Sequence, residues 1–238
     1  MNHNIDPKTA KVTVGIDPGE SKTAVVALVM DDSGNSDIFS WVLDLKTPKE
    51  PAYVAALRAS YLLDGCFWTL EGHDSRIGIH SAQSSIHPDV KMPKTEPRTL
   101  LGRGYGKVDA IAVEGQNVAY TTKSTQAKPQ SICDLSLVTG SLLATVYDKV
   151  KETRVFCPKP RDWKGNVPKH INQARTLKSL GIEFTTRGTG KRRYCVPVNW
   201  QQYTTAHSSR IGLSNWYDLS DALGLALYAN KKLSTVRY

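Results

Sequence analysis

KVTVGIDPGESK, at residues 11–22, is the stretch around which the rest of the chain is organised. An apolar run over 12–16 predicts a short strand that delivers Asp17 to its end. The Pro-Gly pair at 18–19 then turns the chain, because proline fixes φ and glycine tolerates positive φ. A second β-type run over 23–30 follows, so the unit reads strand–turn–strand. Asp17 either starts the turn, as aspartate commonly does, or holds a metal ion from the end of a buried strand. This stretch alone leaves both interpretations open.

The composition favours a polyanionic partner. The chain has 238 residues, enough for one sizeable core, and 40% of them are hydrophobic. Its 31 lysines and arginines against 22 aspartates and glutamates give a net charge of +9. Such an excess favours nucleic acid first and an anionic membrane surface second.

The sequence also predicts where the protein acts. The sequence contains no run of 18 apolar residues and so predicts no membrane span, and we expect no membrane partner. Residues 1–10 are polar and are expected to form a flexible tail rather than a signal peptide. The 4 cysteines are widely spaced and include no CxxC pair, which favours reduced thiols. We therefore expect a cytoplasmic protein.

The order of the predicted elements is that of a mixed α/β fold. Three strands in an antiparallel meander open the chain, and later strands alternate with crossover helices. Residues 64–107 are predicted to form an insertion with little regular structure. Residues 185–193 (TTRGTGKRR) are predicted to form a mobile, phosphate-binding arm rather than a packed element; a merely solvated loop is the alternative for this segment. The expected strands are 12–16, 23–30, 38–45, 108–114 and 154–156; the expected helices are 51–63, 131–150, 170–180 and 216–231; a basic, turn-rich loop is expected over 160–169.

Three further carboxylates follow Asp17 at points where they could converge on it. Glu114 ends the fourth strand, and Asp218 and Asp221 lie on the last helix at i, i+3 spacing, which puts them on one face. Their place near the helix N-terminus is also explained by the helix dipole alone. Four converging carboxylates would repel one another unless cations neutralised them, and an all-oxygen donor set suits Mg²⁺ or Mn²⁺. Two such ions can hydrolyse a phosphodiester, and the basic surface would hold its backbone.

The motifs GIDPG (15–19), AVEGQ (112–116) and DLSDALGLALYA (218–229) resemble those of the RuvC-type Holliday junction resolvases, members of the retroviral-integrase/RNase H superfamily. This resemblance implies an RNase H-like mixed five-stranded sheet flanked by helices. It also implies a single nuclease domain over 11–238, with insertions at about 64–107 and 181–213. The implied activity is that of a crossover junction endodeoxyribonuclease, a homodimer that resolves four-way or other branched DNA by paired nicks and leaves 5′-phosphate and 3′-hydroxyl ends.

The resemblance also assigns roles to residues of this chain. Asp17, Glu114, Asp218 and Asp221 would be catalytic and bind two Mg²⁺ or Mn²⁺ ions. Lys164 and Lys169 would be catalytic as positively charged residues close to the scissile phosphate. Tyr120 would be an aromatic wedge near the junction centre, and the helix at 131–150 would form the dimer interface. The residues expected to bind DNA are Tyr120, Lys123, Lys128, Lys159, Arg161, Lys164, Arg187, Lys191, Arg192 and Arg193.

Two features leave other interpretations open. The segments at 64–107 and 181–213 depart from the compact bacterial pattern and resemble the additions of phage or organellar relatives. If this protein is encoded by a phage, we expect it to act in the host cytoplasm. A phage version would cut a broader range of branched DNA than four-way junctions. An actin-like ATPase or kinase also opens with a strand and a DxG turn, although 238 residues leave little room for its two domains. A catalytically silent DNA-binding protein and an RNA-directed nuclease of the same superfamily are further alternatives.

Overall fold

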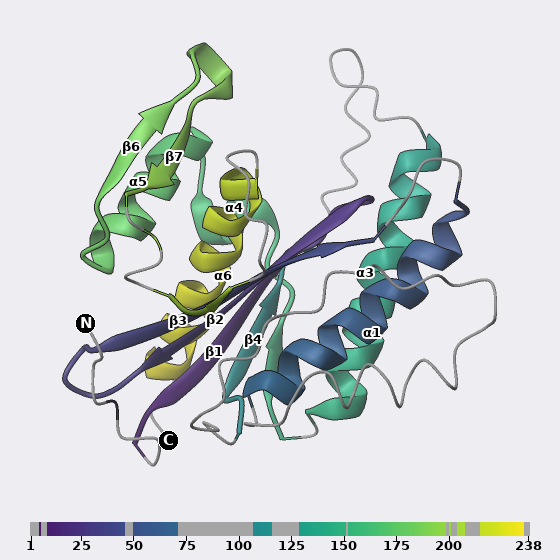
Figure 1. Cartoon of the computed structure of the whole chain (residues 1–238), viewed down its shortest axis with the longest axis horizontal. Helices are drawn as coiled ribbons and strands as arrows, with labels where there is room; N and C mark the ends of the chain where they lie inside the picture. The colour runs from purple at the N-terminus through teal and green to yellow at the C-terminus, as the bar shows by residue number, and fades with distance from the viewer. Residues whose placement is uncertain are drawn as a thin grey trace.

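In the computed structural model, a mixed sheet lies between two layers of helices (Figure 1). The structure describes residues 5, 9–45, 50–70, 107–115, 129–150, 152–198, 200, 204–207 and 215–235. The strands are β1 (Lys11–Asp17), β2 (Lys22–Met30), β3 (Ser36–Asp44), β4 (Ala110–Val113), β5 (Arg154–Phe156), β6 (Phe184–Arg187), β7 (Tyr194–Pro197) and β8 (Thr204–His207). The helices are α1 (Ala52–Leu70), α3 (Pro129–Lys149), α4 (Pro160–Lys164), α5 (Lys169–Ser179), α6 (Trp216–Thr235) and the short 3₁₀ helix η1 (Gly190–Arg192).

The strand order is β5-β4-β1-β2-β3-β8. β1, β2 and β3 form the expected antiparallel meander, whereas β4 runs parallel to β1 and β5 runs parallel to β4. The first five strands in this order form the mixed sheet expected for an RNase H-like fold, which confirms the predicted fold class. β8 adds a sixth strand parallel to β3.

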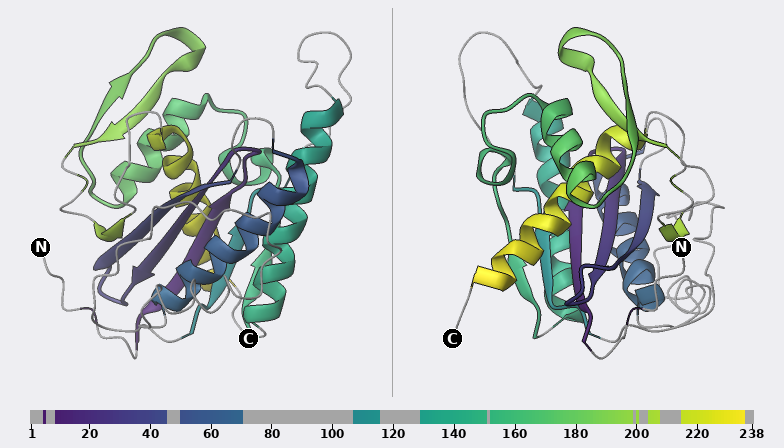
Figure 2. Two further views of the ribbon diagram at one scale, coloured as in Figure 1. Left: turned by 45° about the vertical axis from the view of Figure 1, so that its right-hand side comes forward. Right: turned by 90° about the vertical axis from the view of Figure 1, so that its left-hand side faces the viewer.

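Both faces of the sheet are covered, which explains why the central strands read as continuous apolar runs. Val25, Ala27 and Val29 of β2 face a core formed with α1 and α3, while the alternate residues of β2 face a second core formed with α6. Figure 2 shows α1 and α6 on these opposite faces. Ile5, in the predicted tail, is also buried in the first core.

Gly15 brings α6 close to the sheet. A Cβ at this position would lie 1.9 Å from the carbonyl oxygen of Ala222 and 2.5 Å from the backbone nitrogen of Ala226. Any side chain would therefore push the helix away from β1. The absence of a side chain at residue 15 sets the distance between the end of β1 and the acidic first turns of α6.

Three predicted elements differ from the structure. The helix expected over 51–63 continues to Leu70, because Cys66 and Phe67 bury their side chains in the α1–α3 core. The loop expected over 160–169 contains α4, whose first turn is closed by a 2.9 Å hydrogen bond from the Lys159 backbone to Asp162.

The segment expected to be an arm, 185–193, forms the far strand end and turn of a β-hairpin, and its described side chains are exposed, whereas the strand that follows it is packed. β6 and β7 pair antiparallel, and Cys195 and Val196 of β7 are buried against α5 and α6. Gly188, with φ of 77°, turns the chain where a Cβ would lie 2.4 Å from the Arg192 carbonyl oxygen. Among the helices in the described part of the chain, none is long and apolar enough to cross a membrane.

Candidate active site

The ends of two parallel strands bring the first two acids together. β1 and β4 pair in register up to Ile16 and Val113, so Asp17 and Glu114 leave adjacent strands side by side. The Glu114 backbone N–H donates to the Ile16 carbonyl at 3.0 Å, and the Asp17 and Glu114 carboxyl groups share a hydrogen bond. Two carboxyl groups can share a hydrogen bond only when one of them carries a proton.

The other two acids come from the start of α6. Asp221 lies in the second turn of a helix whose neighbouring residues Ala222, Leu225 and Ala226 are all buried, and its side chain is 1% exposed. Asp218 is partly exposed one turn earlier. The close approach at Gly15 places this part of α6 over the end of β1. The fold thereby brings all four predicted acids to one place.

Two lysines neutralise part of this charge. The Lys164 ammonium lies 3.2 Å from Glu114 Oε1 and 3.6 Å from Asp221 Oδ2, and the Lys169 ammonium lies 2.9 Å from the same Asp221 oxygen. Lys164 ends α4 and Lys169 begins α5. The Lys169 ammonium also lies 3.2 Å from the ring centre of Tyr217, a cation–π contact.

These six residues line one cleft of about 360 Å³, together with Pro18, Gly19, Ser21 and Lys22. Burial is the main cause that raises the pKa of Asp17 well above its usual range, and the negative charges of Asp221 and Glu114 raise it further. Burial also raises the pKa of Asp218. Burial disfavours the Lys164 ammonium, but the carboxylates of Asp221 and Glu114 outweigh it and raise the pKa of that lysine. The raised pKa of Asp17 therefore reflects both burial and the repulsion between neighbouring acids in the cleft.

Two residues of the site were absent from the predicted set. Trp163 donates its indole N–H to Glu114 Oε1 at 3.3 Å, and Gln173 donates its side-chain amide to Asp221 Oδ1 at 3.3 Å. Gln173 is fully buried on α5. The detectable signal for Gln173 is a polar residue on the buried side of a basic helix, whereas no sequence spacing pairs Trp163 with Glu114.

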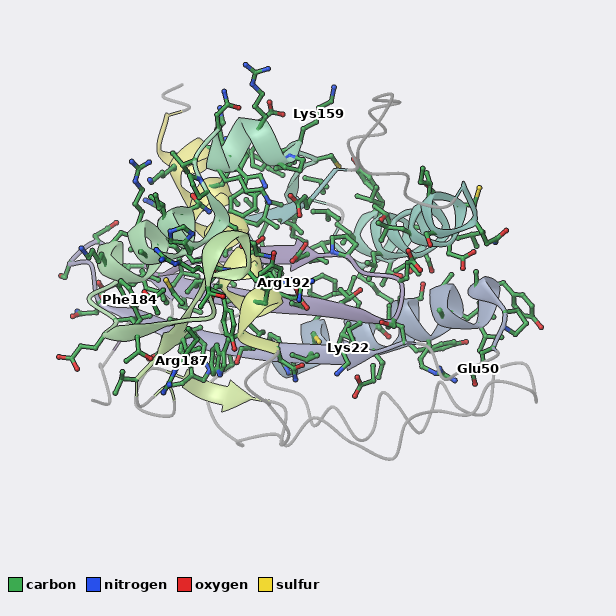
Figure 3. The ribbon with its side chains drawn as sticks, turned by 90° about the horizontal axis from the view of Figure 1, so that it is seen from above. Lys22, Glu50, Lys159, Phe184, Arg187 and Arg192 are labelled. Atoms are coloured by element: carbon green, nitrogen blue, oxygen red, sulfur yellow. The ribbon has the colours of Figure 1, made fainter. Side chains whose placement is uncertain are left out.

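Of the residues expected to bind DNA, Lys164 lines the cleft, and the others with described side chains form two groups outside it. Lys159 precedes α4 and Arg161 lies on it, and both are exposed. Arg187, Arg192 and Arg193 are exposed on the β6–β7 hairpin. Figure 3 shows Lys159 by α4, and Arg187 and Arg192 on the hairpin. The remaining predicted residues, Tyr120, Lys123, Lys128 and the side chain of Lys191, lie outside the described part of the chain.

The cleft supplies a set of oxygen donors, but in the described part of the chain they are not gathered into a metal centre. Within the described ranges, no three His, Cys, Asp or Glu side chains are arranged to hold a metal ion. The contacts above give the physical reason, since lysine ammonium groups occupy Glu114 and Asp221 while Asp17 bonds to Glu114. The donor types still fit a hard divalent cation, because the cleft offers carboxylates and neither histidine nor cysteine.

Comparison with protein-family models finds no match, and comparison with curated proteins finds none either. Solved structures do match. A Thermus thermophilus RuvC structure is 16% identical, with a TM-score of 0.48 over 94% of this chain and 97% of that one. T. thermophilus RuvC in complex with Holliday junction substrate is 16% identical, with a TM-score of 0.47 over 91% and 90%. The human cytomegalovirus terminase nuclease domain is 15% identical, with a TM-score of 0.38 over 95% and 86%.

Proposed function

We propose that this protein is a metal-dependent, structure-selective DNA endonuclease that resolves Holliday junctions or other branched DNA. The observation that carries this proposal is the convergence of Asp17, Glu114, Asp218 and Asp221 on one cleft, from two parallel strand ends and one helix. A purely structural turn or helix cap would not require four acids to share a site in which burial and mutual repulsion raise the pKa of Asp17.

The charge balance of the cleft supports cation binding. Four carboxyl groups, including Asp17 with its raised pKa, face three lysines, and one of these lysines, Lys22, lies 3.5 Å from Asp44. Asp17, Glu114, Asp218 and Asp221 would hold Mg²⁺ or Mn²⁺, at two positions as the resemblance implies. The bound ions would activate a water and stabilise the charge that develops on the phosphate. Glu114 and Asp221 would have to exchange their lysine contacts for this purpose.

The lysines then become available to the substrate. Lys164 and Lys169 reach the cleft from neighbouring helices, and each side chain is 21% exposed. Released from the acids, their ammonium groups would bind the non-bridging oxygens of the scissile phosphate. Hydrolysis joins the oxygen of water to phosphorus and breaks the bond to the 3′ oxygen, which takes a proton. The products are a 5′-phosphate and a 3′-hydroxyl.

The exposed cations extend this site along a DNA backbone. Lys159 and Arg161 lie at α4, and Arg187, Arg192 and Arg193 lie on the hairpin. Phosphate contacts from such residues fix the position of a duplex without reading its sequence. Two groups of cations on different elements suit a substrate with more than one arm.

Paired nicks require two active sites, and α3 is the helix proposed to join them. Leu137 and Tyr147 are 48% and 62% exposed on it, while Val138, Leu142 and Val146 are buried against the α1–α3 core. A helix that is apolar on more than one side is suited to pack against a second copy. We propose a homodimer through α3.

Cleavage of a synthetic four-way junction, mapped at nucleotide resolution with Mg²⁺ and with Mn²⁺, tests the proposal. We expect paired nicks on opposing strands, and we expect Asp17→Asn to bind the junction without cutting it. Matched linear duplex and an RNA–DNA hybrid serve as substrate controls. Wild-type protein that binds the junction and leaves it intact with both metals would overturn the proposal. Equal cutting of all three substrates would exclude structure selectivity.

A further inference from the structure

The buried amide of Gln173 links the hairpin to the acid cluster. Its Nε2 donates to Asp221 Oδ1 at 3.3 Å and to the Tyr217 carbonyl at 3.1 Å. Its Oε1 accepts the backbone N–H of Cys195, on β7, at 3.0 Å. Both ends of the amide are therefore engaged, one by α6 and the other by the hairpin.

These partners fix which way the amide points. A backbone N–H can only donate, so the carbonyl oxygen of Gln173 must face Cys195 and the NH₂ group must face α6. The NH₂ group then holds Oδ1 of Asp221, which leaves Oδ2 for Lys169 at 2.9 Å and Lys164 at 3.6 Å. We propose that Gln173 is a positioning residue that orients the Asp221 carboxylate for metal binding and couples that orientation to β7. This inference rests on the proposed function.

A second contact path joins the same hairpin to the same site. Tyr194 of β7 lies edge-on to Tyr217 of α6, with ring centres 6.2 Å apart. The face of Tyr217 in turn holds the Lys169 ammonium. The strand that carries the basic turn thus touches both an acid and a lysine of the cleft through one intermediate residue each.

The chemistry at residue 173 requires both a donor and an acceptor. Leucine would leave the Cys195 N–H and Asp221 Oδ1 without this partner, in a fully buried position. Glutamate would keep the acceptor for Cys195 but would place a second carboxylate against Asp221. The two substitutions therefore separate the anchoring of β7 from the orientation of Asp221.

Mn²⁺ titration monitored by electron paramagnetic resonance tests the first part. We expect Gln173→Leu to weaken Mn²⁺ binding about 10- to 100-fold, the usual effect of losing a residue that orients a metal ligand. In an Asp221→Asn background the same substitution should change the affinity by less than about 2-fold, because the two residues act as one unit. The matched control is Thr176→Val, since Thr176 is buried on the same helix and packs near Gly224 of α6.

Junction cleavage tests the coupling. We expect Gln173→Glu to lower kcat at least about 10-fold while KM for the junction stays within about 2-fold, because the Cys195 anchor is kept. Wild-type kcat in Gln173→Glu combined with a low kcat in Gln173→Leu would reduce the role to anchoring β7 and overturn the inference. Equal losses in Gln173→Leu and Thr176→Val would also overturn it, since they would reflect packing alone. If wild-type protein binds Mn²⁺ and cuts no DNA, the proposed function fails, while the Mn²⁺ cycle still decides the role of Gln173.

Discussion

The packing of α6 on β1 can be tested by adding one methyl group, in Gly15→Ala. The new Cβ would lie 1.9 Å from the Ala222 carbonyl oxygen, whereas an ordinary contact begins at 3.4 Å. The helix must therefore move away by about 1.5 Å, because backbone atoms on both sides leave no side chain to adjust. Overpacking of this kind costs about 1–3 kcal/mol of unfolding free energy. For a chain of this size, that lowers Tm by about 2–12 °C.

The same displacement should reach the chemistry, since Asp218 and Asp221 move with α6. A misplacement of about 1 Å can lower a catalytic rate about 10²-fold. We expect a loss of this size in single-turnover junction cleavage at 20 °C, where calorimetry should show the variant still folded.

Gly140→Ala is the control for stability, because a Cβ at this position on α3 meets nothing within 4 Å. It should leave Tm unchanged or raise it, as alanine favours helix over glycine. Wild-type Tm and wild-type cleavage in Gly15→Ala would refute the close packing of α6 on β1.

Three other perturbations have expected outcomes. Burial and the charges of Asp221 and Glu114 raise the pKa of Asp17, so metal-free protein should lose stability as the pH rises above about 4, the unfolded pKa, and through the folded pKa. Asp17→Asn should raise the Tm of the metal-free protein at pH 8 by about 2–4 °C for each kcal/mol of repulsion removed. A lower Tm of this variant in calorimetry would contradict the prediction. Arg187→Ala and Arg192→Ala should each weaken junction binding and reduce the slope of log K against log salt concentration by about 1, as measured by fluorescence anisotropy between about 50 and about 200 mM salt. The kcat at saturating junction should not change. An unchanged slope would show that the arginine does not contact the DNA. Leu137→Glu should convert the proposed homodimer to monomer in light scattering and make nicks on the two strands independent, whereas a monomeric wild type would remove α3 as the interface.

The scaffold could be predicted from the sequence because its signals are local. Apolar runs ending at Asp17 and Glu114 mark two strands, and the i, i+3 aspartates mark one helix face. Given an RNase H-like order of elements, parallel pairing of β1 with β4 follows, and so does the meeting of their ends. The local signals therefore predict the four acids, whereas Lys164 and Lys169 follow only from the family resemblance.

The differences arise where tertiary contacts override local pattern. The sequence pattern predicts that the helix ends at residue 63, yet Cys66 and Phe67 gain enough burial in the α1–α3 core to carry α1 onward to Leu70. The glycines and arginines near 188–193 suggest a loose arm. The strand that follows it is packed because Cys195 and Val196 are buried against α5 and α6. Both helices lie outside any short sequence window around these residues, so no local pattern predicts the contact.

The hairpin also explains how the cleft can hold an unfavourable set of charges. Carboxyl groups that repel one another would separate unless rigid neighbours held them, and three of the four acids here have such a neighbour. Asp17 is held by the β1–β4 pairing, Glu114 by Trp163, and Asp221 by Gln173 and the hairpin behind it. The stored repulsion is what a divalent cation would relieve, so the metal-free protein should be less stable than its packing alone would allow. A site of this kind gains metal affinity from the same repulsion that lowers its stability, which is why we expect Asp17→Asn to be both more stable and inactive.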